Sequence, residues 1–282
     1  MKRSDSFVWS DLLKLRPAPR ARPNASEEYT PYHLGFGLKD FGARRPRFAF
    51  LSGDPQRANK IAFEHLSEVE ILSEKRGLST YLGRLPNGVD VLSCTSGMGA
   101  SSLSIVVNEL VQLGINQIIR VGTCGSIQPN ISPGSVVVSQ ACLCRQGAAD
   151  DVAPAEYPAA ADLFLTLALL RAAQELGVVF HLGVTASVDT FYEGQERFTV
   201  SAHPFLLRRL KGQTEEFREL GIANYEMESG TLFKLGGIYG FAAASVCAVI
   251  AQLTEGENIV INTKDLAEQN AIAVALKAAE LL

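Results

Sequence analysis

Two glycine-containing segments carry arginines of the kind that bind anions. In the first, Gly53-Asp54-Pro55-Gln56-Arg57, the glycine permits close approach of the backbone and Arg57 offers a forked donor. Asp54 can cap a helix and Pro55 can occupy its first position, and the N-terminus of such a helix favours negative charge. The alternative is an ordinary strand-to-helix turn with a solvated arginine, and taken alone this segment favours the alternative.

The second segment is Arg120-Val121-Gly122-Thr123-Cys124-Gly125, where an arginine interrupts an apolar run. Burying a guanidinium is costly unless it has an anionic partner, which could be a ligand or an internal carboxylate. The third possibility is that the side chain extends along its stem to water. Because this segment and the first would suit the same ligand, together they predict a phosphate site.

A third segment, from Thr190 to Arg197, carries groups that match a planar, amide-like base. Gln195 can both donate to and accept from one edge of such a base, and Arg197 can donate to a carbonyl. Phe191 can stack on a ring. The alternative is a polar loop with incidental aromatic residues.

A fourth segment places two carboxylates two residues apart, at Glu226 and Glu228. Paired carboxylates suit vicinal hydroxyls, which need charged acceptors. Helix capping by Glu228 is the alternative, and it explains only one of the two residues.

An α/β architecture is expected to position these segments. From Arg47 onward, short apolar runs of β type alternate with runs of helical periodicity. The expected strands are Arg47–Ser52, Val89–Ser93, Gln117–Val121, Ser135–Leu143, His181–Ser187, Asn224–Met227 and Phe241–Ala251. The expected helices are Ser101–Leu113, Ala159–Leu176, Glu228–Gly237 and Lys264–Leu282. This alternation predicts one domain with a largely parallel or mixed sheet covered on both faces, and ligands at the carboxyl ends of its strands.

Composition narrows the function classes. The chain has 282 residues, of which 47% are hydrophobic, enough for a sizeable core, and its formal net charge is −4. A duplex nucleic acid would need a basic surface, and a membrane span would need about 18 consecutive apolar residues, so neither partner is expected. The five cysteines suggest neither a complete disulfide framework nor a zinc site. We therefore expect buried thiols, no metal and a reducing, cytoplasmic setting.

The segments RVGTCGSIQPNISPGSVVV, GVTASVDTFYEGQER and NYEMESGTL resemble the uridine phosphorylases of the nucleoside phosphorylase family. The likeness runs from about Tyr32 to the C-terminus and preserves the order and spacing of all four segments. It implies a single nucleoside phosphorylase domain over residues 31–282, with a three-layer αβα fold and a mixed, partly barrel-like central sheet. Residues 1–30 would form an N-terminal extension that is flexible or docked at an interface.

The resemblance also implies an activity, the reversible phosphorolysis of uridine to uracil and ribose 1-phosphate, with deoxyuridine and thymidine as further candidate substrates. Phosphate would be the co-substrate and no cofactor would be needed. The minimal unit would be a homodimer, with a hexamer built from dimers as the larger alternative.

Site roles follow from the same resemblance. Phosphate would be held by Gly53, Arg57, Arg120 and Thr123, with Arg76 of a neighbouring subunit. The ribose would contact Thr123, Glu226, Met227 and Glu228, with His33 of a neighbouring subunit at the 5′-hydroxyl. The base would contact Phe191, Gln195 and Arg197. The catalytic set would be Arg120, Thr123, Gln195, Arg197 and Glu228.

Two positions depart from the family pattern. Leu253 stands where several relatives have an arginine that supports the base pocket, and Gly77 stands where bacterial relatives have a glutamate that binds a monovalent cation. A purine nucleoside phosphorylase is the nearest competing activity, but it is disfavoured because the aspartate that would protonate the purine is absent after the last strand, where only Glu255 or Glu257 could substitute. A hydrolase would have no use for three phosphate-binding arginines, and a non-catalytic nucleoside-binding protein would not need a complete site, so both fit these residues less well.

Overall fold

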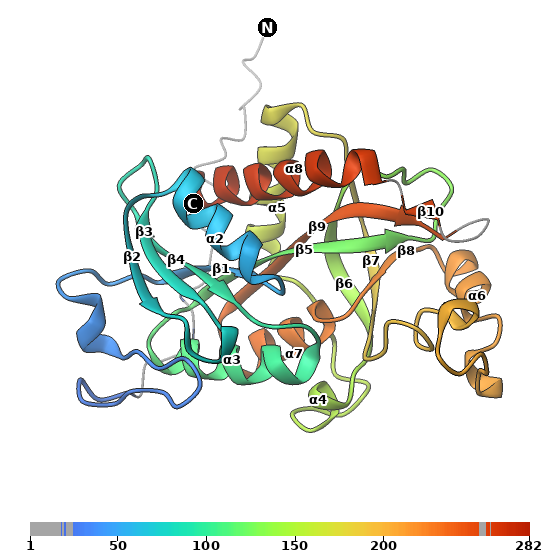
Figure 1. The fold of residues 1–282 in the computed structure, drawn as a ribbon, viewed down its shortest axis with the longest axis horizontal. Helices are drawn as coiled ribbons and strands as arrows, with labels where there is room; N and C mark the ends of the chain where they lie inside the picture. The colour runs from blue at the N-terminus through green and yellow to red at the C-terminus, as the bar shows by residue number, and fades with distance from the viewer. Residues whose placement is uncertain (1–17, 19, 21–24, 254–257, 260) are drawn as a thin grey trace, which may run out of the picture.

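The computed structural model describes residues 18, 20, 25–253, 258–259 and 261–282. Its centre is a ten-stranded mixed sheet in the order β10-β9-β6-β7-β8-β5-β1-β4-β3-β2 (Figure 1). The strands are β1 (Phe48–Ser52), β2 (Ser67–Ser73), β3 (Thr80–Arg84), β4 (Asp90–Thr95), β5 (Gln117–Ser126), β6 (Val136–Arg145), β7 (Phe180–Val188), β8 (Ile222–Glu226), β9 (Ala242–Gln252) and β10 (Asn258–Ile259).

Part of this sheet closes on itself. Besides its pairing with β1 and β8, strand β5 pairs in parallel with β9 along nearly its whole length. Strands β5, β8, β7, β6 and β9 therefore form a closed ring, and β1, β4, β3 and β2 extend from it as an open sheet. The predicted mixed, partly barrel-like sheet is confirmed.

Helices cover both faces of the sheet. They are α2 (Pro55–His65), α3 (Ala100–Gln112), α4 (Gly147–Asp150), α5 (Leu163–Leu176), α6 (Gln213–Glu219), α7 (Ser229–Tyr239) and α8 (Ile261–Glu280), with short 3-10 turns at Leu38–Phe41, Lys75–Gly77, Phe198–Val200 and Arg208–Leu210. In Figure 1, α2, α5 and α8 lie over one face, and α3 and α7 lie over the other. Each layer buries its own apolar cluster, so the predicted three-layer architecture is confirmed.

Local signals explain several boundaries. Asp54 caps α2 by accepting a hydrogen bond from the Gln56 amide at 2.9 Å, and Pro55 occupies the first helical position, as expected. The predicted helix from Ala159 begins only at Leu163, because the preceding residues pair with β6: the Cys142 amide donates to the Ala159 carbonyl at 2.8 Å. The β2–β3 pair and α6 were not anticipated from the sequence.

The described part of the N-terminal extension touches the body of the protein. The Ala25 amide donates to the Gln112 carbonyl at 3.3 Å, and Arg20 Nη2 donates to the Gly237 carbonyl at 2.9 Å. The domain boundary at residue 31 stays a prediction. All five cysteines are free thiols. Within the described residues, no helix is long and apolar enough to cross a bilayer, and no cluster of three potential metal-ligating side chains is found.

Candidate active site

A cavity of about 480 Å³ opens where β1, β5, β8 and β9 end and where α2, α7 and α8 begin. Of the predicted site residues, Gly53, Arg57, Arg120, Thr123, Phe191, Gln195, Arg197, Glu226, Met227 and Glu228 line it. The cavity thus gathers all four segments. The first and third follow the ends of β1 and β7, the fourth spans the end of β8, and the second, expected as a loop after a shorter strand, lies within β5.

Arg57 is buried at one side of the cavity and has a carboxylate partner. Its Nη1 donates to the Val121 carbonyl at 3.3 Å, and its Nη2 lies 3.1 Å from Glu268 Oε1. Its buried Nε has no hydrogen-bond partner among the described residues. Arg57 therefore offers an unsatisfied donor, and buried donors of this kind are costly unless a ligand completes them.

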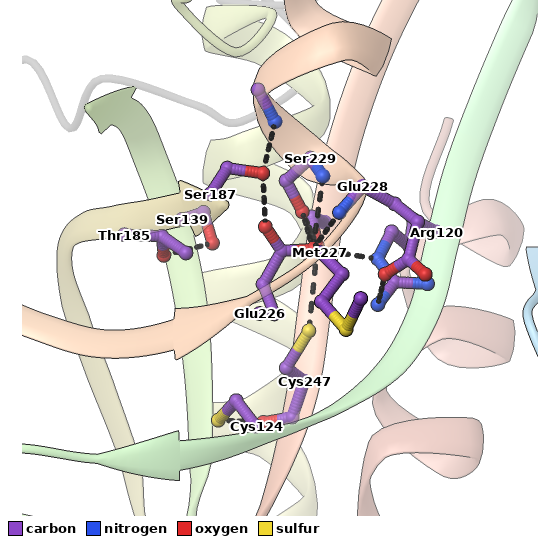
Figure 2. A network of polar contacts seen from close by, with 12 residues as sticks. Arg120, Cys124, Ser139, Thr185, Ser187, Glu226, Met227, Glu228, Ser229 and Cys247 are labelled. Atoms are coloured by element: carbon purple, nitrogen blue, oxygen red, sulfur yellow. Dashed lines mark hydrogen bonds and ion pairs between the residues drawn. The ribbon is translucent and has the colours of Figure 1, made fainter. Parts of the chain in front are cut away.

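Arg120 is paired internally, which was one of the options left open by the sequence. Its Nε lies 3.0 Å from Glu226 Oε2, and its Nη2 lies 2.6 Å from Glu228 Oε2 (Figure 2). A Cβ atom at Gly122 would stand 2.7 Å from Arg120 Nη2, so glycine is needed for the side chain to fold across the strand. Burial lowers the pKa of Arg120, but Glu228, Cys247 and Glu226 outweigh burial and raise it, so the guanidinium stays charged.

The two carboxylates differ in their surroundings. Glu226 is enclosed by donors from Arg120, Ser187, Glu228 and Ser229. Glu228 accepts a hydrogen bond from the Gly99 amide at 2.6 Å and faces the cavity. Burial raises the pKa of Glu228 above that of an exposed glutamate, although Arg120 opposes the shift.

The base-recognition segment forms one connected group. Gln195 Oε1 accepts a hydrogen bond from Arg197 Nε at 3.1 Å, and the Arg197 guanidinium lies 4.3 Å from the centre of the Phe191 ring. Burial lowers the pKa of Arg197. A Cβ atom at Gly125 would meet Arg197 Nη2 at 3.0 Å and a methyl group of Leu253 at 3.2 Å. Leu253 and Arg197 therefore both approach the backbone at Gly125, which places an apolar side chain near the predicted base-recognition group.

His33 and Arg76 lie outside this cavity. His33 Nδ1 is 2.7 Å from Glu109 Oε1, and Arg76 Nη2 donates to Tyr32 Oη at 3.3 Å. Lys75 Nζ also donates to the Tyr32 carbonyl, so the segment carrying His33 and the turn carrying Arg76 are joined. Their predicted action on a neighbouring subunit stays a prediction.

Other lining residues were missed by the sequence analysis. Met98, Tyr225, Ile250, Lys264 and Glu268 all contribute to the cavity wall. Lys264 and Glu268 are spaced to share one face of α8, with Lys264 Nζ 4.0 Å from Glu268 Oε1. Their spacing of four residues indicated a shared face of a helix, but nothing in the local sequence indicated that α8 reaches Arg57. Glu255 and Glu257, considered as acids for a purine, lie outside the described residues.

Comparison with known proteins identifies the family of this chain. The sequence profile described as the phosphorylase superfamily matches residues 47–281. The chain belongs to the phosphorylase superfamily. This phosphorylase is 40% identical over 252 residues to the uridine phosphorylases of Salmonella typhimurium and Escherichia coli, covering 89% of this chain and 97% of each relative. It is 37% identical over 235 residues to the uridine phosphorylase of Thermococcus kodakarensis, covering 82% of this chain and 81% of that relative. Every predicted residue that lines the cavity of this phosphorylase falls inside the matched region.

Proposed function

We propose that this phosphorylase cleaves uridine with inorganic phosphate, giving uracil and ribose 1-phosphate. The observation that carries the proposal is that one cavity holds two buried arginines suited to an anion, a carboxylate suited to sugar hydroxyls, and an amide–guanidinium pair suited to a uracil edge. The relatives from Salmonella typhimurium, Escherichia coli and Thermococcus kodakarensis are uridine phosphorylases, which supports the same substrate.

The chemistry follows from these groups. Arg57, Arg120, Thr123 and the backbone at Gly53 would hold phosphate beside the anomeric carbon. As the bond from that carbon to uracil N1 breaks, the sugar gains oxocarbenium character and the electron pair passes to the base. Gln195 and Arg197 would donate to the oxygens of the departing base, while a phosphate oxygen forms the new bond to the sugar. Arginine keeps its own proton throughout, so it stabilises charge without acting as an acid.

Ribose would be held by Glu228 and by the backbone at Met227. Glu228 is the carboxylate that faces the cavity, and its oxygens contact Arg120 and the Gly99 amide. Both partners are donors, and they leave an acceptor site for a sugar hydroxyl because a carboxylate has about four lone-pair positions.

Charge supports a contribution from a second copy of the chain. Four positive and four negative side chains line the cavity, so their formal charges cancel. A phosphate dianion would gain from one more cation, which Arg76 of a neighbouring subunit would supply, with His33 of that subunit at the ribose. A homodimer is then the minimal unit, and a hexamer built from dimers is the larger alternative. Free thiols agree with the cytoplasmic setting proposed for such an enzyme.

Uracil release by the purified chain tests the proposal. With uridine, we expect release that depends on added phosphate, and kcat/KM above that for inosine by at least about tenfold, because the two-ring purine carries its amide edge farther from the sugar than uracil does and would not present it to Gln195 and Arg197 in the same place. Deoxyuridine and thymidine complete the panel. Release without phosphate would indicate a hydrolase, and binding of uridine without any release would indicate a nucleoside-binding protein.

A further inference from the structure

Glu226 is the most enclosed carboxylate of the site. Its Oε2 lies 3.0 Å from Arg120 Nε, 3.0 Å from the Glu228 amide, and 2.9 Å from both the amide and the hydroxyl of Ser229. Its Oε1 accepts from the Ser187 hydroxyl at 2.6 Å, and its side chain is 1% exposed. A carboxylate has about four lone-pair positions, and five donors already surround this one. Four of these donors meet at Oε2, so that oxygen has no position left for a sugar hydroxyl, and the low exposure of the side chain limits access to Oε1 (Figure 2).

The donors that Glu226 holds belong to both halves of the site. Through Arg120 Nε it fixes the guanidinium that faces the phosphate end of the cavity. Through the amides of Glu228 and Ser229 it fixes the turn at the start of α7, which also carries Met227. The positive end of that helix stabilises the buried charge of Glu226 in return.

Glu226 and Glu228 therefore bind Arg120 in different ways. Glu228 faces the cavity, and a ligand hydroxyl can compete for its oxygens. Glu226 also borders the cavity, but its side chain is only 1% exposed and is held by five donors, so a ligand has less access to its bond with Arg120. A guanidinium held at Nε by this nearly buried carboxylate keeps its orientation when Glu228 turns to a ligand.

We propose that Glu226 is a positioning residue and does not contact ribose. It aims Arg120 at phosphate and sets the Met227–Glu228 turn against the sugar. This inference rests on the proposed function for the identity of the two ligands, but the first measurement of its test is phosphate binding, which does not require turnover.

The test compares the parent with Glu226→Gln, which keeps the shape of the side chain and removes its charge. Inorganic phosphate is titrated calorimetrically in the absence of nucleoside. We expect the Kd for phosphate to rise roughly tenfold, because a charge-assisted hydrogen bond that orients Arg120 is lost. We also expect kcat/KM for uridine and for 2′-deoxyuridine to fall by the same factor, because no contact with the 2′-hydroxyl is removed.

Ser139→Ala is the matched control. Ser139 forms a buried hydrogen bond of 2.7 Å with Thr185 in the same barrel and does not contact Glu226. Its loss should lower the melting temperature without changing the Kd for phosphate. If Glu226→Gln does not fold, Glu226→Asp, which keeps the charge but withdraws the carboxylate, is measured in its place with the same expectations.

Three results would overturn the inference. An unchanged phosphate Kd together with a loss confined to uridine would make Glu226 a direct contact of the 2′-hydroxyl. An unchanged phosphate Kd with equal losses on both nucleosides would make its role merely structural. A parent that binds phosphate more tightly than the variant but releases no uracil would defeat the proposed function and leave this inference standing. A parent that binds no phosphate would defeat both.

Discussion

At the scale of single residues, the arginines of the cavity are already paired before any ligand binds. Arg57 contacts Glu268, and Arg120 contacts Glu226 and Glu228. Pairing makes burial of these charges tolerable, since an isolated buried charge costs several kcal/mol. It also means that phosphate adds to an existing network of charges, so the affinity for phosphate depends on the carboxylates as well as on the arginines.

Gln195 and Arg197 are the donors expected to stabilise the uracil anion. Replacing either with alanine should lower kcat/KM for uridine by roughly 10²–10³, by analogy with the loss of an oxyanion-hole donor. Steady-state kinetics on uridine and inosine measure the effect, which should be far smaller for inosine. Arg171→Ala is the control, because Arg171 makes an exposed ion pair with Glu175 on α5. A double variant whose turnover of uridine stays within about twofold of the parent would refute the assignment.

The buried carboxyl of Glu228 should leave a signature in the pH dependence of stability. Because burial raises its pKa, the folded protein holds this proton more tightly than the unfolded chain does. The folded state therefore loses stability relative to the unfolded state as pH rises from the ordinary glutamate pKa through the raised one. The melting temperature of the parent should fall relative to that of Glu228→Gln over that interval and then level off. If the melting temperature of the parent instead rises relative to that of Glu228→Gln over this pH interval, the raised pKa is contradicted.

At the scale of elements, α8 contributes to a site that is otherwise built from strand ends. Glu268 on this helix lies 3.1 Å from Arg57, and Lys264 lies one turn before it at the cavity wall. The helix packs against β9 and α5 through a row of alanines and larger aliphatic residues. Close packing by small side chains holds the helix axis near the sheet, and this brings the Glu268 side chain within reach of Arg57.

Glu268→Gln should weaken phosphate binding by removing the partner that orients Arg57. We expect KM for phosphate to rise roughly three- to tenfold, with little change in KM for uridine, because a hydrogen bond to a charged group is lost at the phosphate end only. Glu280→Gln on the same helix is the control, since Glu280 lies 3.7 Å from Lys277, away from the cavity. If the KM for phosphate of this variant equals that of the parent, Glu268 does not contribute to phosphate binding.

The elements also show how far sequence reasoning extends. Apolar runs such as Phe48–Ser52 and the cap at Asp54 are local signals, and the structure confirms both. The β2–β3 pair was missed because β2 is largely exposed and lacks an apolar alternation. The contact between Glu268 and Arg57 was missed because it joins distant parts of the chain. The partly barrel-like sheet was predicted from the resemblance alone, and the β5–β9 pairing that closes it was not predicted, since no strand by itself indicates its neighbours.

At the scale of the whole molecule, His33 and Arg76 bear on the oligomeric state. Both lie outside the cavity of their own chain, on two segments joined by Lys75 and Tyr32. The Lys75 ammonium also lies 4.5 Å from the centre of the Tyr32 ring. Two candidate site residues that lie together outside the cavity of their own chain fit the proposed shared active site.

Subunit complementation tests the shared site. Arg76→Ala and Arg197→Ala chains should each be nearly inactive as homodimers, because each site lacks one cation. In a heterodimer, one site carries both lesions and the other carries neither, so co-expression should restore a part of the activity. Tagged chains purified in tandem show that heterodimers form. Heterodimers as inactive as either parent would mean that each site is complete within one chain.

The central claim is that inorganic phosphate takes the place of uracil on the sugar, and following inorganic phosphate during the reaction tests it most directly. Phosphorus-31 NMR follows inorganic phosphate and sugar phosphate while uracil is quantified from the same reaction. We predict that each uracil released is matched by one ribose 1-phosphate formed and one inorganic phosphate consumed, because a phosphate oxygen takes the place of the base on the anomeric carbon. Uracil released together with free ribose, at a constant level of inorganic phosphate, would contradict the account.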